Sequence, residues 1–290
     1  MTSYLIHQLK YALFIPLFSE FADPQLLLEI ATKAENAGWD GIFLPDHLMH
    51  DNKYGSWLDI IVSLSSIAVN TSRIKIGTWV LPLPRRQPWQ LAKQLATIDQ
   101  LSNGRLILGA GLGSPASDYT SIGMDYDTKI LAEKLDEGLT ILDLCWKGMP
   151  FSYDGKHYKL EHVELHPKPY QKPRIPILIA GRWPAKKPIL RGSKWDGIMP
   201  ITNRFPEQFK ENELRDLVTY YLSLRENNNN GDIVIGWNQP GTTNKAEFHD
   251  LCKDIGVTWL MHNLHPMMGP IDKQLEIMSM GQKHTLRACD

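Results

Sequence analysis

An acidic residue and a histidine follow one of the short apolar segments of this sequence, and together they could exchange protons. Residues 41–45 read GIFLP, and Asp46 and His47 come next. A carboxylate beside an imidazole that can be neutral near pH 7 is a common pair in general acid–base catalysis. A plainer interpretation is also open, in which His47 closes a loop and Asp46 caps the following helix. The residues alone leave both interpretations open.

Glycine-rich and basic segments follow two other apolar runs and would suit an anionic ligand. Bare glycine backbone lets the main chain approach a ligand closely, and the N–H groups at a helix start attract phosphate. The alternative is a solvated basic helix face, which suits Lys187 and Arg191 better than Arg182. The candidates after run 106–108 are Gly111, Leu112, Gly113 and Ser114, and those after run 177–180 are Gly181, Arg182, Trp183 and Lys186.

Aromatic residues add a flat apolar surface to these candidates. Trp79 and Val80 stand near the end of the apolar run 74–81, Trp183 follows the run 177–180, and Trp237 ends the run 233–237. An acid–imidazole pair, tryptophans and a basic helix start together suit a flat aromatic ligand that carries a phosphate.

The spacing of His47 and His50 invites a metal site, which would need further ligands such as His262 and His265. No acidic residue or cysteine completes such a set, so we expect no metal. A dinucleotide fingerprint at 109–114 (GAGLGS) is also disfavoured, because its third glycine is out of place and no strand-ending acid follows about twenty residues later.

Helix and strand signals alternate along the whole chain, and they would place these residues at the ends of strands. The clearest signals lie within 91–113: apolar residues at helical spacing, then Asn103-Gly104, which tolerates positive φ, then a buried strand. Asp23-Pro24 indicates another helix start. Eight strands are expected, at 11–16, 41–45, 74–81, 106–108, 177–180, 197–200, 233–237 and 258–263.

Strands that alternate with helices eight times predict a closed (β/α)8 TIM barrel, with an open doubly wound sheet as the alternative. Active sites of such barrels lie at the C-terminal ends of the strands, where the candidate residues fall. Residues 150–175, between the fourth helix and the fifth strand, break the alternation, and Asp154-Gly155 there indicates a hairpin-like insertion. We expect residues 1–290 to form a single domain.

The composition excludes several classes of function. The formal net charge is −1, so nothing favours nucleic acid or an anionic membrane as a partner. No run reaches the roughly 18 apolar residues that a membrane helix needs, and the first residues do not read as a signal peptide. The three cysteines, Cys145, Cys252 and Cys289, are far apart, which predicts reduced thiols and a cytoplasmic protein.

Four segments resemble the bacterial-luciferase-like family of flavin- or deazaflavin-dependent oxidoreductases. They are AENAGWDGIFLPDH (34–47), IKIGTWVLP (74–82), LAKQLATIDQLSNGRLILGAGLGS (91–114) and IPILIAGRWPAKKPILRGSKWDGIMP (175–200). The resemblance runs from about residue 11 to residue 200, and its most specific part is the block before the fourth strand. It implies a TIM barrel whose mouth holds FMN or coenzyme F420.

The resemblance also implies roles for individual residues. Asp46 and His47 would lie beside the reactive centre of the ring system as the catalytic residues, and the Arg182 loop would meet the phosphate. Trp79-Val80 stands where many family members carry a cis peptide bond that supports the ring, so a cis bond here is a hypothesis that the resemblance suggests. Ser114 replaces an acidic residue of the sugar-phosphate dehydrogenase branch, and Leu112 lies near a position where the luciferase branch has a cation. FMN and coenzyme F420 therefore both stay open.

The resemblance thus implies an enzyme that passes hydride to a small organic substrate, or a monooxygenase that uses reduced FMN. A separate flavin or F420 reductase would be a partner, and the default assembly is a homodimer. The alternative is a barrel that binds flavin without turnover. An aldolase is disfavoured because no strand ends in a lysine, and a metal-dependent hydrolase because the metal set is incomplete.

Overall fold

The computed structural model describes residues 8–50, 54–225, 231–237 and 245–281. Within it the chain divides into two compact units. The first unit consists of Met1–Pro16, Glu29–Phe43 and Ile177–Asp290, and the second of Leu17–Leu28 and Leu44–Pro176. We describe each unit by itself, and a single domain over 1–290 stays a prediction.

The first unit is built on a parallel sheet in the order β2-β1-β11-β10-β9-β8. The longest register in it runs from Leu178↔Gly197 to Trp183↔Thr202, between β8 and β9. The strands are β1 (Lys10–Phe14), β2 (Gly41–Leu44), β8 (Ile177–Trp183), β9 (Gly197–Thr202), β10 (Asp232–Trp237) and β11 (Trp259–Asn263).

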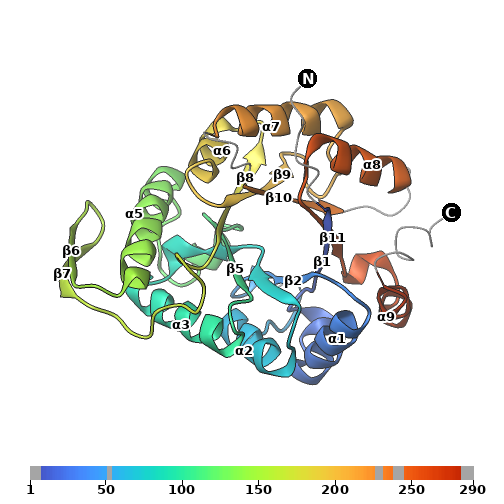
Figure 1. Ribbon diagram of the computed structural model, residues 1–290, viewed down its shortest axis with the longest axis horizontal. Coiled ribbons are helices and arrows are strands. Elements are labelled where there is room, and N and C mark those ends of the chain that lie inside the picture. The colour runs from blue at the N-terminus through green and yellow to red at the C-terminus, as the bar shows by residue number, and fades with distance from the viewer. Residues whose placement is uncertain (1–7, 51–53, 226–230, 238–244, 282–290) are drawn as a thin grey trace. The chain divides into compact units, whose positions relative to one another are not determined.

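Helices α6, α7 and α8 lie along the outer side of β8, β9 and β10 (Figure 1). Strand residues such as Ile198 and Ile233 pack there against Leu217 and Tyr221 of α7 and Phe248 of α8, in one buried apolar cluster. The cluster supplies the hydrophobic free energy that holds these elements together. The helices of this region are α1 (Pro24–Asn36), α6 (Lys186–Gly192), α7 (Glu211–Ser223), α8 (Lys245–Ile255) and α9 (Ile271–Ser279), with a short η4 (Pro266–Met268).

The second unit has β3 (Lys75–Thr78) parallel to β5 (Leu106–Gly111), which also pairs with the short β4 (Leu81–Pro82). The Thr78 hydroxyl joins β3 to β5: it donates to the Gly109 carbonyl at 2.7 Å and accepts from the Gly109 N–H at 2.9 Å. Its helices are α2 (Ile60–Asn70), α3 (Pro88–Leu101), α4 (Ser117–Thr120) and α5 (Thr128–Lys147), with the short helices η1 (Ser19–Phe21) and η3 (Leu83–Arg85).

Local signals in the sequence mark the starts and ends of several helices as expected. Asp23 accepts hydrogen bonds from the N–H groups of Gln25 and Leu26 at the start of α1. Asn103 and Gly104 after α3 have φ values of 52° and 79°. Arg105 is buried and donates to the carbonyls of Ala68 and Thr71 at the end of α2, so it stabilises that helix terminus.

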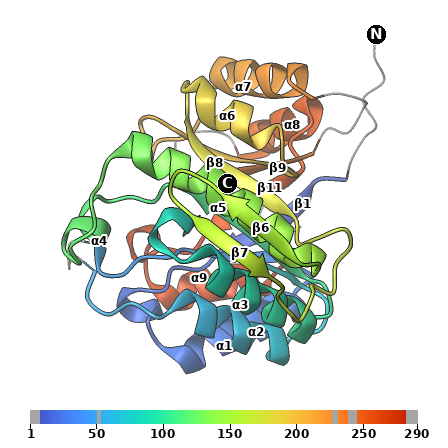
Figure 2. The ribbon, with the colours of Figure 1, turned by 90° about the vertical axis from the view of Figure 1, so that its left-hand side faces the viewer.

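The segment 150–175 contains an antiparallel hairpin of β6 (Phe151–Asp154) and β7 (Lys159–Val163). It lies beside α5 (Figure 2). The Glu137 carboxylate on α5 accepts hydrogen bonds from the N–H groups of Lys156, His157 and Tyr158, at 2.9–3.2 Å. A four-residue loop that Glu137 holds therefore joins the two strands, and the hairpin indicated by Asp154-Gly155 is present.

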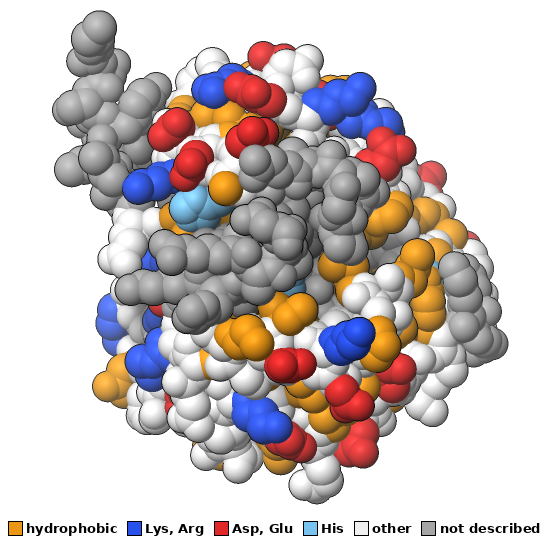
Figure 3. Space-filling model, turned by 90° about the vertical axis from the view of Figure 1, so that its right-hand side faces the viewer, with side chains coloured by type: hydrophobic (Ala, Val, Ile, Leu, Met, Phe, Trp, Pro, Cys, Tyr) orange, Lys and Arg blue, Asp and Glu red, His pale blue; other side chains and the backbone are white. Residues whose placement is uncertain are grey.

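The eight strands expected from the sequence are all present, as β1, β2, β3, β5, β8, β9, β10 and β11. On the face that Figure 3 shows, basic and acidic side chains of the described residues are interspersed, in keeping with the net charge of −1. Cys145 and Cys252 are buried free thiols, whereas Cys289 lies outside the described residues. Of the helices within the described ranges, none is long and apolar enough to cross a bilayer.

Candidate functional site

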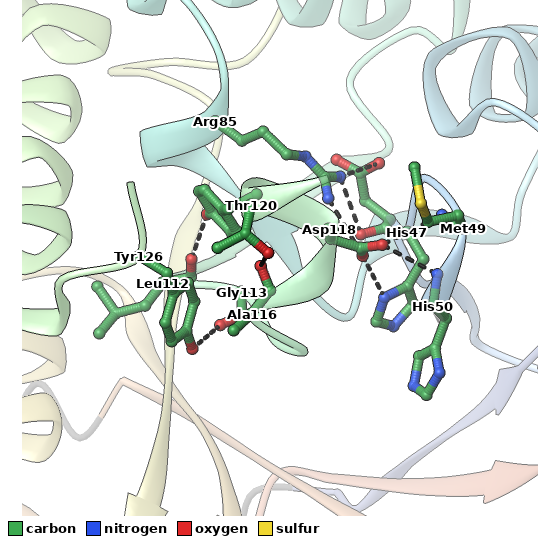
Figure 4. A network of polar contacts seen from close by, with 12 residues as sticks. His47, Met49, His50, Arg85, Leu112, Gly113, Ala116, Asp118, Thr120 and Tyr126 are labelled. Atoms are coloured by element: carbon green, nitrogen blue, oxygen red, sulfur yellow. Dashed lines mark hydrogen bonds and ion pairs between the residues drawn. The ribbon is translucent and has the colours of Figure 1, made fainter. Parts of the chain in front are cut away.

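His47 lies in the loop after β2, and a buried carboxylate holds its ring. His47 Nδ1 is 2.8 Å from Asp118 Oδ2; the Asp118 side chain is 1% exposed and the His47 side chain 22% (Figure 4). Because a carboxylate only accepts, Nδ1 donates in this contact. Nε2 of His47 has no hydrogen bond to any described residue. The imidazole is therefore fixed at one nitrogen and available at the other.

The other oxygen of Asp118 holds the backbone of the same loop. Oδ1 accepts from the N–H groups of Met49 at 3.1 Å and His50 at 2.9 Å. Burial by itself would raise the pKa of Asp118, but the hydrogen bonds from His47, His50 and Met49 outweigh it and hold the pKa well below its ordinary value. Asp118 is therefore a carboxylate throughout the neutral pH range.

Asp118 belongs to α4, which follows β5, and two tyrosines hold the connection between them. The Tyr119 hydroxyl donates to the Leu112 carbonyl, and the Tyr126 hydroxyl donates to the Gly113 carbonyl at 3.0 Å. Gly113 has a φ of 86°, and a Cβ there would lie 2.7 Å from the Pro82 ring, so glycine is required. Gly111 is buried at the end of β5, and Ser114 is exposed.

Asp46 forms ion pairs with two arginines that follow β4. Arg85 Nη2 is 2.9 Å from Asp46 Oδ1, and Arg86 Nη2 is 2.8 Å from Oδ2. Arg85 also reaches Asp118 Oδ2 at 3.3 Å, and its side chain is 4% exposed. Both Asp46 oxygens are thus engaged by guanidinium groups, which suits holding the loop better than exchanging a proton. A catalytic role for Asp46 remains untested.

Aromatic rings surround His47 in the second unit. The centroid of its ring is 4.8 Å from Trp57 and 4.7 Å from His50, and Phe18 packs on Trp57 at 4.6 Å. Trp57 Nε1 and Ser117 Oγ are buried atoms with no hydrogen-bond partner among the described residues. Buried polar atoms of this kind are uncommon and point to a bound water or ligand group.

The peptide bond between Trp79 and Val80 is cis, which confirms the expectation from the sequence. It lies between β3 and β4, and the Trp79 N–H donates to the Leu44 carbonyl at 2.7 Å. Trp79 and Val80 are both half-buried.

The remaining predicted residues lie in the first unit, and the structure corrects their setting. Gly181, Arg182 and Trp183 were expected in a loop after the fifth strand, but β8 extends through Trp183 because its pairing with β9 continues to Thr202. A Cβ on Gly181 would lie 2.2 Å from Pro188 of α6, so only a glycine here lets α6 pack this closely against β8.

Arg182 and Lys186 differ in the contacts that their side chains already make within the protein. Arg182 is exposed, and its hydrogen bond among the described residues is a long one of 3.5 Å to the Thr202 carbonyl. Lys186 Nζ lies 3.9 Å from the ring centroids of both Trp183 and Tyr220. Trp183 is 7% exposed within the apolar cluster of this unit. Arg182 therefore has donors to offer an anion, whereas Lys186 is held between two rings.

The sequence did not identify Asp118, Arg85 or Arg86 as site residues. Asp118 stands four positions after Ser114, so its place shortly after a strand end was the available signal. Within the described part of the chain, no group of three or more His, Cys, Asp or Glu side chains could hold a metal ion. The side chain of Trp237, and residues 238 and 239, lie outside the described residues.

Several known proteins are similar to this chain. An F420-dependent glucose-6-phosphate dehydrogenase of Microbacterium testaceum is 31% identical over 198 residues, 67% of this chain and 57% of the relative. The chain thus spans little more than half the length of that relative.

Two solved structures superpose on nearly all of this chain. An F420-dependent secondary alcohol dehydrogenase, in complex with an F420-acetone adduct, has a TM-score of 0.77 and 14% identity, with 96% of this chain and 99% of that chain covered. The oxygenating constituent of 3,6-diketocamphane monooxygenase from Pseudomonas putida, in complex with FMN, has a TM-score of 0.71 and 14% identity, with 94% and 96% covered.

These likenesses confirm the (β/α)8 barrel as the fold. The model of the luciferase-like monooxygenase family matches residues 13–218, well over half of the sequence. The segments that resembled this family in the sequence lie almost entirely within that match. The chain therefore belongs to the luciferase-like monooxygenase family.

Proposed function

We propose that the protein is an oxidoreductase that uses FMN or coenzyme F420 and acts on a small organic molecule. One observation carries the proposal: His47 follows a barrel strand, a buried carboxylate fixes its Nδ1, and its Nε2 has no partner among the described residues. Such an imidazole can give or take one proton beside a group that undergoes two-electron chemistry. Family membership supports the same conclusion.

The residues present fit a flavin or deazaflavin in two respects. In the second unit, the half-buried Trp79-Val80 bond and the exposed Ser114 offer backbone and apolar surface near strand ends. In the first unit, the exposed Arg182 offers guanidinium donors for a phosphate. When bound, the cofactor supplies the electron transfer that amino-acid side chains cannot perform.

The chain's own residues then have separate tasks. His47 holds or accepts a proton at Nε2, and Arg182 binds phosphate. We assign Asp46 to holding the loop after β2 through its two arginines. The other proposed neighbours of the cofactor are Gly111, Leu112, Gly113, Gly181, Trp183 and Lys186. Of these, Trp183 and Lys186 would act through the shape of β8 and α6.

The choice of cofactor stays open between FMN and coenzyme F420. The Microbacterium relative and the alcohol dehydrogenase are named for coenzyme F420, and the diketocamphane enzyme holds FMN. Ser114 stands where the sugar-phosphate branch would have an acid, so we propose a substrate other than a sugar phosphate. A hydride acceptor or donor such as an alcohol, ketone or enone fits the aromatic surroundings of His47.

Partners and location belong to the same proposal. A homodimer is supported by α2, which has no charged residue and exposes Val62 and Val69 on one face. A separate reductase would supply reduced cofactor. A cytoplasmic location is supported by the free thiols of Cys145 and Cys252.

The deciding experiment measures binding first and turnover second. The purified chain is titrated with FMN and with coenzyme F420, and the reduced complex is then mixed with alcohols, ketones and enones while cofactor absorbance is followed. We expect one cofactor to bind and at least one substrate class to change its redox state. Binding of neither cofactor would refute the proposal, and binding with indifference to every substrate would indicate a storage protein.

A further inference from the structure

Asp118, which the sequence did not single out, lies with its Oδ2 atom 2.8 Å from His47 Nδ1. Resting on the proposed function, we infer that Asp118 is a positioning residue: it keeps the His47 ring in its Nδ1–H form, so that Nε2 is the nitrogen that exchanges the proton. The inference concerns this chain's own side chains and can be tested without cofactor.

The first step is the assignment of the hydrogen. Asp118 Oδ2 lies 2.8 Å from His47 Nδ1, and an ionised carboxylate offers acceptors and no donor. Neutral imidazole has one N–H, so placing it on Nδ1 leaves a lone pair on Nε2. The ring remains 22% exposed, which leaves room for exchange with a neighbouring group.

The second step is that Asp118 is itself fixed. Four groups donate to it: the His47 ring, the N–H groups of Met49 and His50, and Arg85 at 3.3 Å. These donors keep the buried carboxylate charged, and its pKa lies far below its ordinary value. The acceptor at Nδ1 is therefore present at every pH at which the protein would work.

The third step is that the two partners come from different loops (Figure 4). His47 follows β2, whereas Asp118 lies on α4 after β5, where the hydroxyl of its neighbour Tyr119 holds the Leu112 carbonyl. The contact therefore ties two strand-end loops together and sets the ring's orientation along with its tautomer. A single loop could not supply both anchors.

The fourth step is the local charge. Asp46 and Asp118 face Arg85 and Arg86, so two carboxylates are matched by two guanidinium groups. A neutral His47 keeps this cluster balanced. Losing the charge of Asp118 would leave Asp46 as the one carboxylate that faces both arginines, and the excess positive charge disfavours a further cation at His47.

The test reads the tautomer directly in the unliganded chain. Long-range nitrogen–proton correlation spectra distinguish Nδ1–H from Nε2–H imidazole, and His47→Gln identifies the His47 signals among the ten histidines. We expect Nδ1–H in the wild type at neutral pH. An Nε2–H pattern would overturn the inference, whatever the effect of Asp118→Asn on folding.

Asp118→Asn then reverses the donor at the contact. The amide oxygen would stay with the backbone N–H groups, so the NH2 group would face Nδ1 and convert His47 to Nε2–H. Asp46→Asn removes a carboxylate from the same cluster without touching the ring, and should leave the His47 tautomer unchanged. An unchanged tautomer in folded Asp118→Asn, or the same change in both variants, would contradict the inference.

Turnover separates this inference from the proposed function. Asp118→Asn should lower kcat on the order of 10- to 100-fold and change cofactor Kd by less than about threefold. A converted tautomer with kcat unchanged would leave Asp118 as a structural partner only, and so would overturn its role in positioning for catalysis. If the wild type has no turnover, the proposed function fails while the spectra still decide the state of His47.

Discussion

Replacing Arg85 by methionine should destabilise the protein strongly, and most strongly at neutral pH. The Arg85 guanidinium is 4% exposed and touches both Asp46 Oδ1 at 2.9 Å and Asp118 Oδ2 at 3.3 Å. Methionine fills much of the same volume but carries no charge. Two buried carboxylates would then lose a shared counter-charge.

The magnitude follows from the burial of these groups. Removing one partner of a buried ion pair costs about 3–5 kcal/mol, because the remaining charge stays desolvated. Arg86 still pairs with Asp46, and His47 and two backbone N–H groups still donate to Asp118. We therefore expect about 3 kcal/mol, the lower end of the range, which is a large share of the roughly 5–15 kcal/mol of a typical protein.

The pH dependence has a definite sign. The folded-state pKa of Asp118 is depressed, so Asp118 stabilises the wild type above its unfolded value of about 3.9, and this stabilisation is lost as the pH falls below that value. In Arg85→Met the folded-state pKa rises, and the carboxylate can take up a proton on acidification. The difference between wild type and variant should be complete above the variant's folded-state pKa and shrink as the pH falls below it, by about 1.4 kcal/mol in all for each unit by which the pKa rises.

Urea unfolding of both proteins at pH 7, 5 and 3 measures this difference. Arg215→Met is the matched control, because it removes an exposed arginine paired with Glu211 on α7 and should change little at any pH. A loss below about 1 kcal/mol at pH 7, or a loss that grows on acidification, would refute our account of Arg85.

Three further outcomes are expected. His47→Ala should lower kcat about 100-fold or more with little change in cofactor Kd, as measured by stopped-flow absorbance, and loss of binding with normal turnover of the bound fraction would contradict this. Arg182→Ala should raise the cofactor Kd about tenfold in a fluorescence titration, a result that equal constants would exclude. Gly113→Ala should cost more than 2 kcal/mol in thermal unfolding because its φ is 86° and a Cβ meets Pro82, whereas Gly123→Ala, with a φ of 76° and open space, should cost about 1 kcal/mol.

The local signals of the sequence predicted most elements correctly. Asp23 starts α1, and Asn103-Gly104 ends α3, because caps and positive φ depend on neighbouring residues alone. The boundary of β8 was wrong by three residues. Its end depends on pairing with β9 through Trp183↔Thr202, which composition does not reveal.

The candidate site was predicted only in part. His47 and the cis bond at Trp79-Val80 stood out because they belong to a recognisable segment. Asp118 and Arg85 did not, since each looks like an ordinary surface residue and its contact partner is far away in the sequence. Asp118 lies 71 positions from His47, and Arg85 lies 39 positions from Asp46.

The order of the amino acids thus determined the alternation of strands and helices, and with it the barrel and the strand ends where polar groups gather. Both follow from hydrophobic spacing and local backbone preference, which act over a few residues. Only the tertiary structure decided that Asp118, rather than Asp46, holds the His47 ring. Contacts between distant loops depend on how strands are packed side by side, and that packing is a property of the folded chain as a whole.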